Sequence, residues 1–564
     1  MATSRPSALA RLFGLGSVFG KTLRDSTPAA LGAAGLLLVL VVGGGLTMSV
    51  TYGSPATRLE LGMLSRDIPP VLRGFYGNPV RVDTLGGFLG WHYGPYFALI
   101  GGLWSLLALS STLAGEAARG SLDMVLAGPS TRRRVALAKV FAHVTALAAV
   151  VTLTGLATWV TGVVYGVLPG DPIAPAAAAG FAIGLLVRSL VTGSIAFAIA
   201  AVFGKGAGAG IAGAVMAGSY VMYGYRTVFE PFDAISAWTP WAWTANHLPL
   251  VEQTDWPGVA AAAALTLVLL AVGVEGFARR DVGVTVSLPG PRFPRRLAGT
   301  RGPLARSLGE LLPTAWWWAF GLAAYGLVMA ASVRGMMDML ASAPDLAIAF
   351  RTMIPDVDMT TPEGYLQLAF VDMGFVLVGL SVASLVGARL GDEGAGRLEM
   401  FLASGVGRVR WILATWLAVA AGVGAVTLAL AVAVGTGVWA AGYSPWQPMA
   451  GTLVLGAYGL ALAGVGVALG GVGGLGGLTR LSALGGPGSA GVVVMLATVL
   501  TFVLDLFAPV LRLPDWVADL ALTTHLGLPM VGSWEPAGLA ACAALWVGGL
   551  AVGVAGFARR DIGR

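Results

Sequence analysis

Charged residues of both signs gather in a short segment near residue 120, and their spacing suits a helix. Glu116, Arg119 and Asp123 lie three and four residues apart, so they share one helical face. Pro129 follows a glycine and ends this helix, and Arg132 begins the next apolar stretch. A short helix of this kind, exposed at a membrane surface, is suited to bind a soluble partner through complementary charge.

The same pattern recurs in the second half of the chain. The letters LDMVLA at 122–127 return as LEMFLA at 398–403, and the charged residues around the second copy are Glu393, Arg397, Glu399 and Arg408. One copy alone fits equally well with a solvated loop helix that obeys the positive-inside rule. Because two copies occupy equivalent places, we predict two docking surfaces.

Three further charges fall inside or near long apolar stretches: Arg188, Asp372 and Asp505. A charge at that depth is costly and usually faces a polar cavity or an opposite charge. Arg188 and Asp372 are therefore candidates for a translocation pathway, whereas Asp505 lies near the outer end of its stretch. Gly210 and Gly213 allow close helix contact beside such a pathway, although plain packing explains them equally well.

The residues give no sign of catalysis or of a bound cofactor. The four histidines are scattered without ligand spacing, and the single cysteine, Cys542, permits neither an internal disulfide nor a cysteine metal cage. The stretch 14–22, GLGSVFGKT, has Leu15 where a phosphate-binding loop requires glycine. We therefore predict no catalytic residue, no metal site and no nucleotide bound by this chain.

Composition places these residues in a membrane protein. Of the 564 residues 56% are hydrophobic and only 11% are charged, against about 25% in soluble domains. We predict an all-α polytopic protein with about twelve membrane-spanning helices. The expected spans are 28–51, 92–114, 136–164, 174–203, 207–224, 257–277, 314–334, 365–388, 411–440, 449–471, 488–508 and 536–556.

The basic residues orient these spans. With the N-terminus inside, the inner segments hold about three times as many Lys and Arg residues as the outer ones. We therefore expect both termini in the cytoplasm and the net charge of +6 to be an orientation signal, not a nucleic-acid footprint. The large excess of Arg over Lys fits a GC-rich bacterial genome, so the expected location is the bacterial plasma membrane.

An internal repeat divides the chain. GFARRDVG at 276–283 returns as GFARRDIG at 556–563, and six spans precede each copy. An even number of spans per repeat gives both halves the same orientation, so we predict parallel repeats. The expected parts are a first repeat at 1–283 with an N-terminal elbow helix, an Arg- and Pro-rich linker with a second elbow at 284–313, and a second repeat at 314–564.

Two outer segments, 225–256 and 509–535, precede the last span of each repeat. Both are apolar and rich in Trp, but prolines interrupt them. They cannot span a membrane, so we expect re-entrant or interfacial helices.

The charged segments resemble the coupling segments of type-2 ABC exporter permeases, in the fused two-repeat form found in actinobacterial tetronasin and multidrug efflux systems. The resemblance implies that these segments contact a separate ATPase subunit, which we expect in two copies and which would hold ATP and Mg. The residues concerned would be Glu116, Arg119, Asp123, Pro129 and Arg132, and Glu393, Arg397, Glu399 and Arg408. The second copy departs from the first, with Ser-Gly-Val at 404–406 in place of Gly-Pro-Ser at 128–130, so its docking geometry is expected to differ.

The resemblance thus implies a permease subunit, without enzymatic activity of its own, that exports hydrophobic or amphiphilic compounds such as antibiotics. Its partners would be the ATPase, membrane lipid and the transported small molecule, with no nucleic acid. The main alternative is an ion-coupled secondary transporter of the major facilitator type, which also has two parallel sets of six spans. A membrane-embedded enzyme would need a cluster of acids or histidines, and a scaffold without transport activity remains a third alternative.

Overall fold

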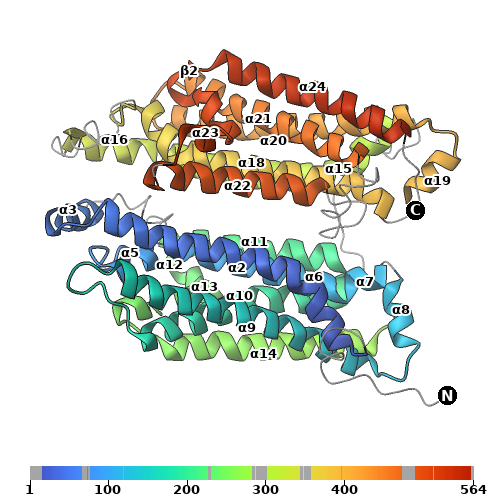
Figure 1. Ribbon diagram of the computed structural model, residues 1–564, viewed down its shortest axis with the longest axis horizontal. Helices are drawn as coiled ribbons and strands as arrows, with labels where there is room; N and C mark the ends of the chain where they lie inside the picture. The colour runs from blue at the N-terminus through green and yellow to red at the C-terminus, as the bar shows by residue number, and fades with distance from the viewer. Residues whose placement is uncertain are drawn as a thin grey trace. The chain divides into compact units, whose positions relative to one another are not determined.

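A computed structural model describes residues 16–66, 73, 77–118, 120–226, 230–281, 286, 302–342, 347–348, 357–394, 397–472, 490–511 and 513–559. In this part of the chain the structure is almost wholly α-helical (Figure 1). The chain forms two compact units, Met1–Gly290 and Pro291–Arg564. Each is described by itself below, as the first and the second unit.

Ten helices in the described residues are long and apolar enough to cross a membrane. The fold class predicted from the sequence, an all-α polytopic membrane protein, is therefore confirmed. In the first unit these helices are α2 (Val18–Val50), α6 (Gly94–Thr112), α9 (Arg132–Tyr165), α10 (Pro175–Phe203) and α14 (Trp256–Arg279). In the second unit they are α15 (Pro303–Ala331, which continues into α16, Val333–Ser342), α18 (Pro362–Gly394), α20 (Arg408–Ala440), α21 (Trp446–Val472) and α24 (Pro536–Arg559).

Two further helices stand where the remaining spans were expected. They are α11 (Lys205–Gly224) and α22 (Ala490–Leu511). Their place as the eleventh and twelfth spans remains a prediction. Short helices complete the first unit at α3 (Pro55–Arg66), α5 (Leu85–His92), α7 (Ala114–Ala118) and α8 (Ser121–Leu126), and the second at α19 (Arg397–Ala403).

The first long helix of each unit is longer than the sequence analysis expected, because elbow and span form one helix. In α2 the Ser17 side chain accepts a hydrogen bond from the Gly20 amide at 3.0 Å and caps the start. Helix α2 then runs through Pro28, and α15 likewise runs through Pro313. A separate elbow helix is thus absent from the described part of both units, and a proline stands in its place between the charged and apolar parts.

Helix α10 occupies the centre of the first unit, where it packs against α6, α9, α11 and α14. In the second unit α21 packs most extensively against α24, and α20 against α15. Where α21 meets α24, a Cβ atom added to Gly549 would lie 2.2 Å from the carbonyl oxygen of Gly464. The two backbones are therefore in direct contact there, as small residues permit in membrane helices.

The segments before the last long helix of each unit form short elements, none of which is long enough to span a membrane. In the first unit these are α12 (Glu230–Ser236), α13 (Pro240–Ala245) and η1 (Pro249–Val251). In the second they are α23 (Asp515–Ala518), η4 (Leu522–Leu526), β1 (Gly527–Leu528), η5 (Pro529–Val531) and β2 (Ser533–Trp534). Strands β1 and β2 pair antiparallel.

Candidate functional site

Helices α8 and α19 occupy equivalent positions in their units, each just before a long helix. On both, a leucine faces inward, because Leu122 and Leu398 are each 0% exposed. Two residues further on, Met124 is 77% exposed and Met400 is 68% exposed. Each helix therefore presents a large apolar side chain to its surroundings and anchors itself with another.

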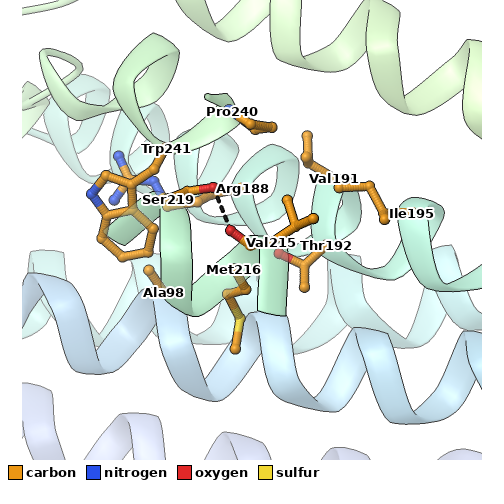
Figure 2. A pocket seen from close by; sticks show the side chains of 10 residues that line it. All are labelled: Ala98, Arg188, Val191, Thr192, Ile195, Val215, Met216, Ser219, Pro240 and Trp241. Carbon is orange, nitrogen blue, oxygen red and sulfur yellow. Dashed lines mark hydrogen bonds between the residues drawn. The ribbon is translucent and has the colours of Figure 1, made fainter. Parts of the chain in front are cut away.

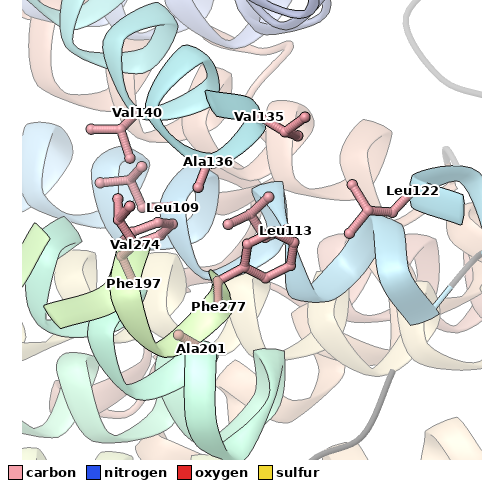
Figure 3. Packing of buried hydrophobic residues seen from close by; sticks show 10 residues of the cluster. All are labelled: Leu109, Leu113, Leu122, Val135, Ala136, Val140, Phe197, Ala201, Val274 and Phe277. Carbon is pink, nitrogen blue, oxygen red and sulfur yellow. The ribbon is translucent and has the colours of Figure 1, made fainter. Parts of the chain in front are cut away.

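Behind α8 lies a hydrophobic cluster that joins four long helices (Figure 3). Leu122 of α8 lies in this cluster with Leu109 of α6 and Leu113 just beyond its end, together with residues of α9, α10 and α14 such as Phe277. Interiors of this kind are close-packed, so displacement of one element is transmitted to its neighbours. The cluster therefore connects α8 to the ends of these four helices.

The predicted docking residues of the first unit divide into outward-facing and inward-facing groups. Asp123 and Pro129 are exposed. Glu116 instead faces inward, where its carboxylate lies 2.7 Å from the Lys139 ammonium on α9. Arg132 donates from Nη1 to the Arg280 carbonyl oxygen at 2.5 Å, which ties the start of α9 to the end of α14. Arg119 lies outside the described residues.

In the second unit Arg397 and Glu399 of α19 are exposed, and Glu393 at the end of α18 is half-buried. Arg408 donates from Nη1 to the Ala558 carbonyl oxygen at 3.3 Å, so it ties α20 to α24 as Arg132 ties α9 to α14. The Arg306 guanidinium of α15 lies 3.8 Å from the centre of the Phe401 ring of α19, which connects the first long helix to the candidate docking helix.

Two buried cations near these helices were not identified from the sequence. The side chain of Lys139 is 2% exposed and pairs with Glu116, while that of Arg389 on α18 is 2% exposed and pairs with Glu310 of α15. Lys139 lies within the expected span 136–164, so an ionisable residue inside an apolar stretch was the available signal.

The candidate pathway residue Arg188 lies on α10, and its side chain contacts α13. Its Nε donates to the Thr244 hydroxyl at 3.1 Å, its Nη2 donates to the Thr244 carbonyl oxygen at 2.5 Å, and its guanidinium lies 5.7 Å from the Trp241 ring. Figure 2 shows Arg188 and Trp241 together at one side of a small cavity, with Val191 and Ile195 across from them. Arg188 and Trp241 also line a second, larger cavity of about 220 Å³ in the first unit.

The other candidate pathway residues lie in different surroundings. Asp372 is an exposed residue of α18, and Asp505 of α22 accepts a hydrogen bond from the Thr523 hydroxyl at 2.6 Å. A Cβ atom at Gly210 would meet nothing within 4 Å, and one at Gly213 would meet only a leucine methyl at 3.8 Å. The close contact of α11 with α10 is made instead at Gly208, where an added Cβ atom would lie 2.6 Å from the backbone oxygen of Ala196.

A second buried ion pair lies at the opposite end of the first unit from α8. Arg58 of α3 binds Asp171 through both guanidinium nitrogens, at 2.8 and 3.0 Å. The backbone amides of Leu85 and Leu168 donate to the same carboxylate. Burial raises the pKa of Asp171, but Arg58 and the two amides outweigh it, so this pKa lies below its ordinary value.

Within the described residues, no group of three or more His, Cys, Asp or Glu side chains is placed to hold a metal ion. The features that remain are therefore the two exposed helices α8 and α19 and the cavity beside Arg188.

Comparisons with known proteins show which proteins this chain resembles. Residues 301–558 match the family described as the C-terminal domain of the multidrug efflux system permease Rv1217c. The chain is also 30% identical over 371 residues to the multidrug efflux system permease protein Rv1217c of Mycobacterium tuberculosis, which covers 62% of this chain and 61% of the relative. The chain is thus a multi-pass membrane protein homologous to that permease, and the match spans less than two thirds of the relative's length. The relative's description points to a transport subunit and gives no support to the major facilitator type.

Proposed function

We propose that this chain is the permease subunit of an ABC exporter that moves hydrophobic or amphiphilic compounds out of the cell, driven by a separate ATPase. The observation that carries the proposal is the pair of equivalent helices α8 and α19. Each buries one leucine in its unit and exposes a methionine and an acid two and one residues away. Central apolar anchors surrounded by charge are typical of protein interfaces.

Two copies of the ATPase would dock on the two helices, one on each. ATP-driven closure of that pair would push on α8 and α19, and the packing behind Leu122 would pass the displacement to the long helices of the first unit. The direction of transport is supported by the relative, which is named an efflux permease. Export further requires that the substrate binds more weakly in the outward-open state than in the inward-open state.

The test is co-purification of the intact chain with its ATPase in detergent, combined with ATP-dependent efflux from cells. The variant carries Asp123→Arg, Met124→Asp, Glu399→Arg and Met400→Asp, all on exposed side chains. We expect it to fold, to lose the ATPase and to lose efflux. The matched control carries Glu60→Arg and Asp515→Arg, which reverse exposed acids on α3 and α23.

Retention of both ATPase and efflux by the quadruple variant would contradict the role of α8 and α19. Efflux that follows a proton or sodium gradient without any ATPase would contradict the ABC assignment itself. Glu116 is unsuitable for this test, because its replacement would leave Lys139 buried without a partner.

A further inference from the structure

The cavity of about 220 Å³ in the first unit has an unusual balance of charge. Its wall includes three arginines, Arg73, Arg188 and Arg226, and the lining residues within the described part of the chain include no Asp, Glu or Lys. Aromatic side chains from several elements share this wall, among them Phe181 and Trp241. A wall whose described residues offer cationic and aromatic groups but no carboxylate favours an anion attached to an aromatic or apolar body.

Arg188 has hydrogen-bonding capacity left over. A guanidinium carries five N–H donors, and the two hydrogen bonds described above, both to Thr244, occupy two of them. Arg188 also forms no ion pair with a carboxylate in the described part of the chain. Since it lines both the larger cavity and the small one in Figure 2, its cationic group lies between an aromatic space and an apolar one.

The neighbouring groups do not neutralise this charge. Arg226 stacks on Tyr223, with 3.8 Å from its guanidinium to the ring centre, and donates to the Tyr223 carbonyl oxygen at 2.7 Å. His247 accepts from the Asp255 amide at Nδ1, and its Nε2 lies 3.1 Å from the Gly180 carbonyl oxygen, the arrangement of a neutral ring. Burial lowers the pKa of His247 in agreement with this.

We propose that this cavity binds the anionic group of an amphiphile with an aromatic body, through Arg188 and Arg226, and that the exported substrates include such acids. The claim that such acids are exported rests on the proposed export function. The claim that the cavity binds them does not, because binding is a property of the chain itself. The cavity is smaller than the roughly 300–1,000 Å³ of sites that enclose a drug-sized molecule. It therefore holds the acidic ring of a larger substrate or the whole of a small one.

The test measures binding to the purified chain in a neutral detergent with three probes that share a ring system. These are 2-naphthoate, 2-naphthol and 2-naphthylmethylammonium, which differ in charge. We expect 2-naphthoate to bind most tightly and the ammonium most weakly. Arg188→Gln keeps a hydrogen-bond donor for Thr244 but removes the charge, so it should weaken 2-naphthoate binding about 10- to 100-fold and leave 2-naphthol nearly unchanged.

Arg226→Gln provides a second variant that does not alter the contacts of Arg188, and we expect a weaker loss in the same direction. Arg334→Gln, at an exposed arginine of α16 in the second unit, is the matched control and should change nothing. Equal binding of the three probes, or equal loss of all three in Arg188→Gln, would overturn the proposal. Short-chain phosphatidylglycerol should compete poorly with 2-naphthoate, and stronger competition would assign the site to a lipid headgroup instead.

The outcomes separate this inference from the proposed function. If 2-naphthoate does not bind while ATPase-dependent efflux persists, the substrate class is wrong and the exporter assignment stands. If 2-naphthoate binds but no ATPase is required for transport, the cavity stands and the exporter assignment fails.

Discussion

The two units contain helices in a similar order, but different interactions stabilise the inside of each unit. In the described residues, both ion pairs whose two partners are buried or nearly so lie in the first unit, Arg58 with Asp171 and Lys139 with Glu116. The second unit has the closer helix–backbone contact of the two described above: an added Cβ atom would lie 2.2 Å from a backbone oxygen at Gly549 of α24, against 2.6 Å at Gly208 of α11 in the first unit. Two units with a similar order of helices are therefore stabilised by different interactions; that they are repeats of one another remains a prediction.

The buried cation lies at a different sequence position in each unit. The spacing of 276 between LDMVLA and LEMFLA sets Thr415 of α20 against Lys139 of α9, and Arg389 of α18 against Leu113, which directly follows α6. The cation of the first unit is Lys139, paired with Glu116, and that of the second unit is Arg389, paired with Glu310. Each unit therefore pairs a buried cation with a carboxylate, but the two pairs come from different positions.

The largest effect should follow from Asp171→Asn in the first unit. The substitution leaves Arg58, 4% exposed, as a buried charge without its carboxylate, and we expect the free energy of unfolding to fall by about 3–5 kcal/mol. Equilibrium unfolding of the purified chain in mixed micelles measures this. A loss below about 1 kcal/mol would show that the pair of Arg58 with Asp171 does not stabilise the first unit as proposed.

The same variant gives a pH dependence with a defined sign. Because the pKa of Asp171 in the folded chain lies below its ordinary value of 3.8, the pair's contribution is complete above that pH and is lost as the pH falls through the lower folded value. The stability difference between wild type and Asp171→Asn should therefore be constant from pH 7 to pH 5 and shrink only below about pH 4. A decline already at pH 6 would contradict this.

Glu116→Gln should cost about 3 kcal/mol, because Lys139 would remain buried without a partner. The side chain of Glu116 is 14% exposed and therefore less buried than that of Asp171, so we expect the loss of unfolding free energy to be at the lower end of the range of about 3–5 kcal/mol. The double variant Glu116→Gln with Lys139→Met should recover most of it, since the uncompensated charge is then removed. No recovery would show that packing, not charge, sets the cost. Unfolding in the same micelles gives both values.

Gly549→Ala tests the other side of the comparison. The added methyl group would lie 2.2 Å from the Gly464 carbonyl oxygen, so α24 must move away from α21, at a cost of about 2 kcal/mol. Gly210→Ala is the matched control in the first unit, where the methyl group meets nothing within 4 Å. Thermal stability in detergent should fall for the first variant only. Similar stability of the two variants would contradict a close backbone contact between α24 and α21 at Gly549.

Glu310→Gln should have the smallest effect, about 1–2 kcal/mol. Its partner Arg389 is buried, but Glu310 itself is 38% exposed, and water screens part of the interaction. If this loss equals that of Glu116→Gln in parallel unfolding measurements, the two units depend on their ion pairs to the same degree and the contrast drawn above is removed.

The sequence predicted the fold class and the places of the long helices, because apolar stretches of about twenty residues are a strong local signal. It did not predict that α2 begins at Val18 and not near residue 28, since a proline in an amphipathic segment reads as a boundary. The ion pairs could not be predicted from the sequence for a different reason. Arg58 and Asp171 are 113 residues apart, and Arg389 and Glu310 are 79 apart, so only the folded chain brings them together.

The exposure of the candidate docking residues was predictable only in part. Asp123 and Glu399 face outward as a surface helix requires, whereas Glu116 faces Lys139. The prediction that Glu116 and Asp123 share one helical face was wrong, because Glu116 lies on α7 and Asp123 on α8, and Gly120 between them has a left-handed backbone with φ of 73°. The contact of these residues with an ATPase remains a prediction.

Pro28 and Pro313 give the first long helix of each unit a weak joint. A proline inside a helix removes one backbone hydrogen bond and crowds the preceding turn, so the two arms can bend against each other. The short arm carries Lys21 in the first unit and Arg306 and Glu310 in the second, the residues that reach toward Glu116, Phe401 and Arg389. A bend at either proline would therefore shift these charged side chains relative to the apolar part of the same helix.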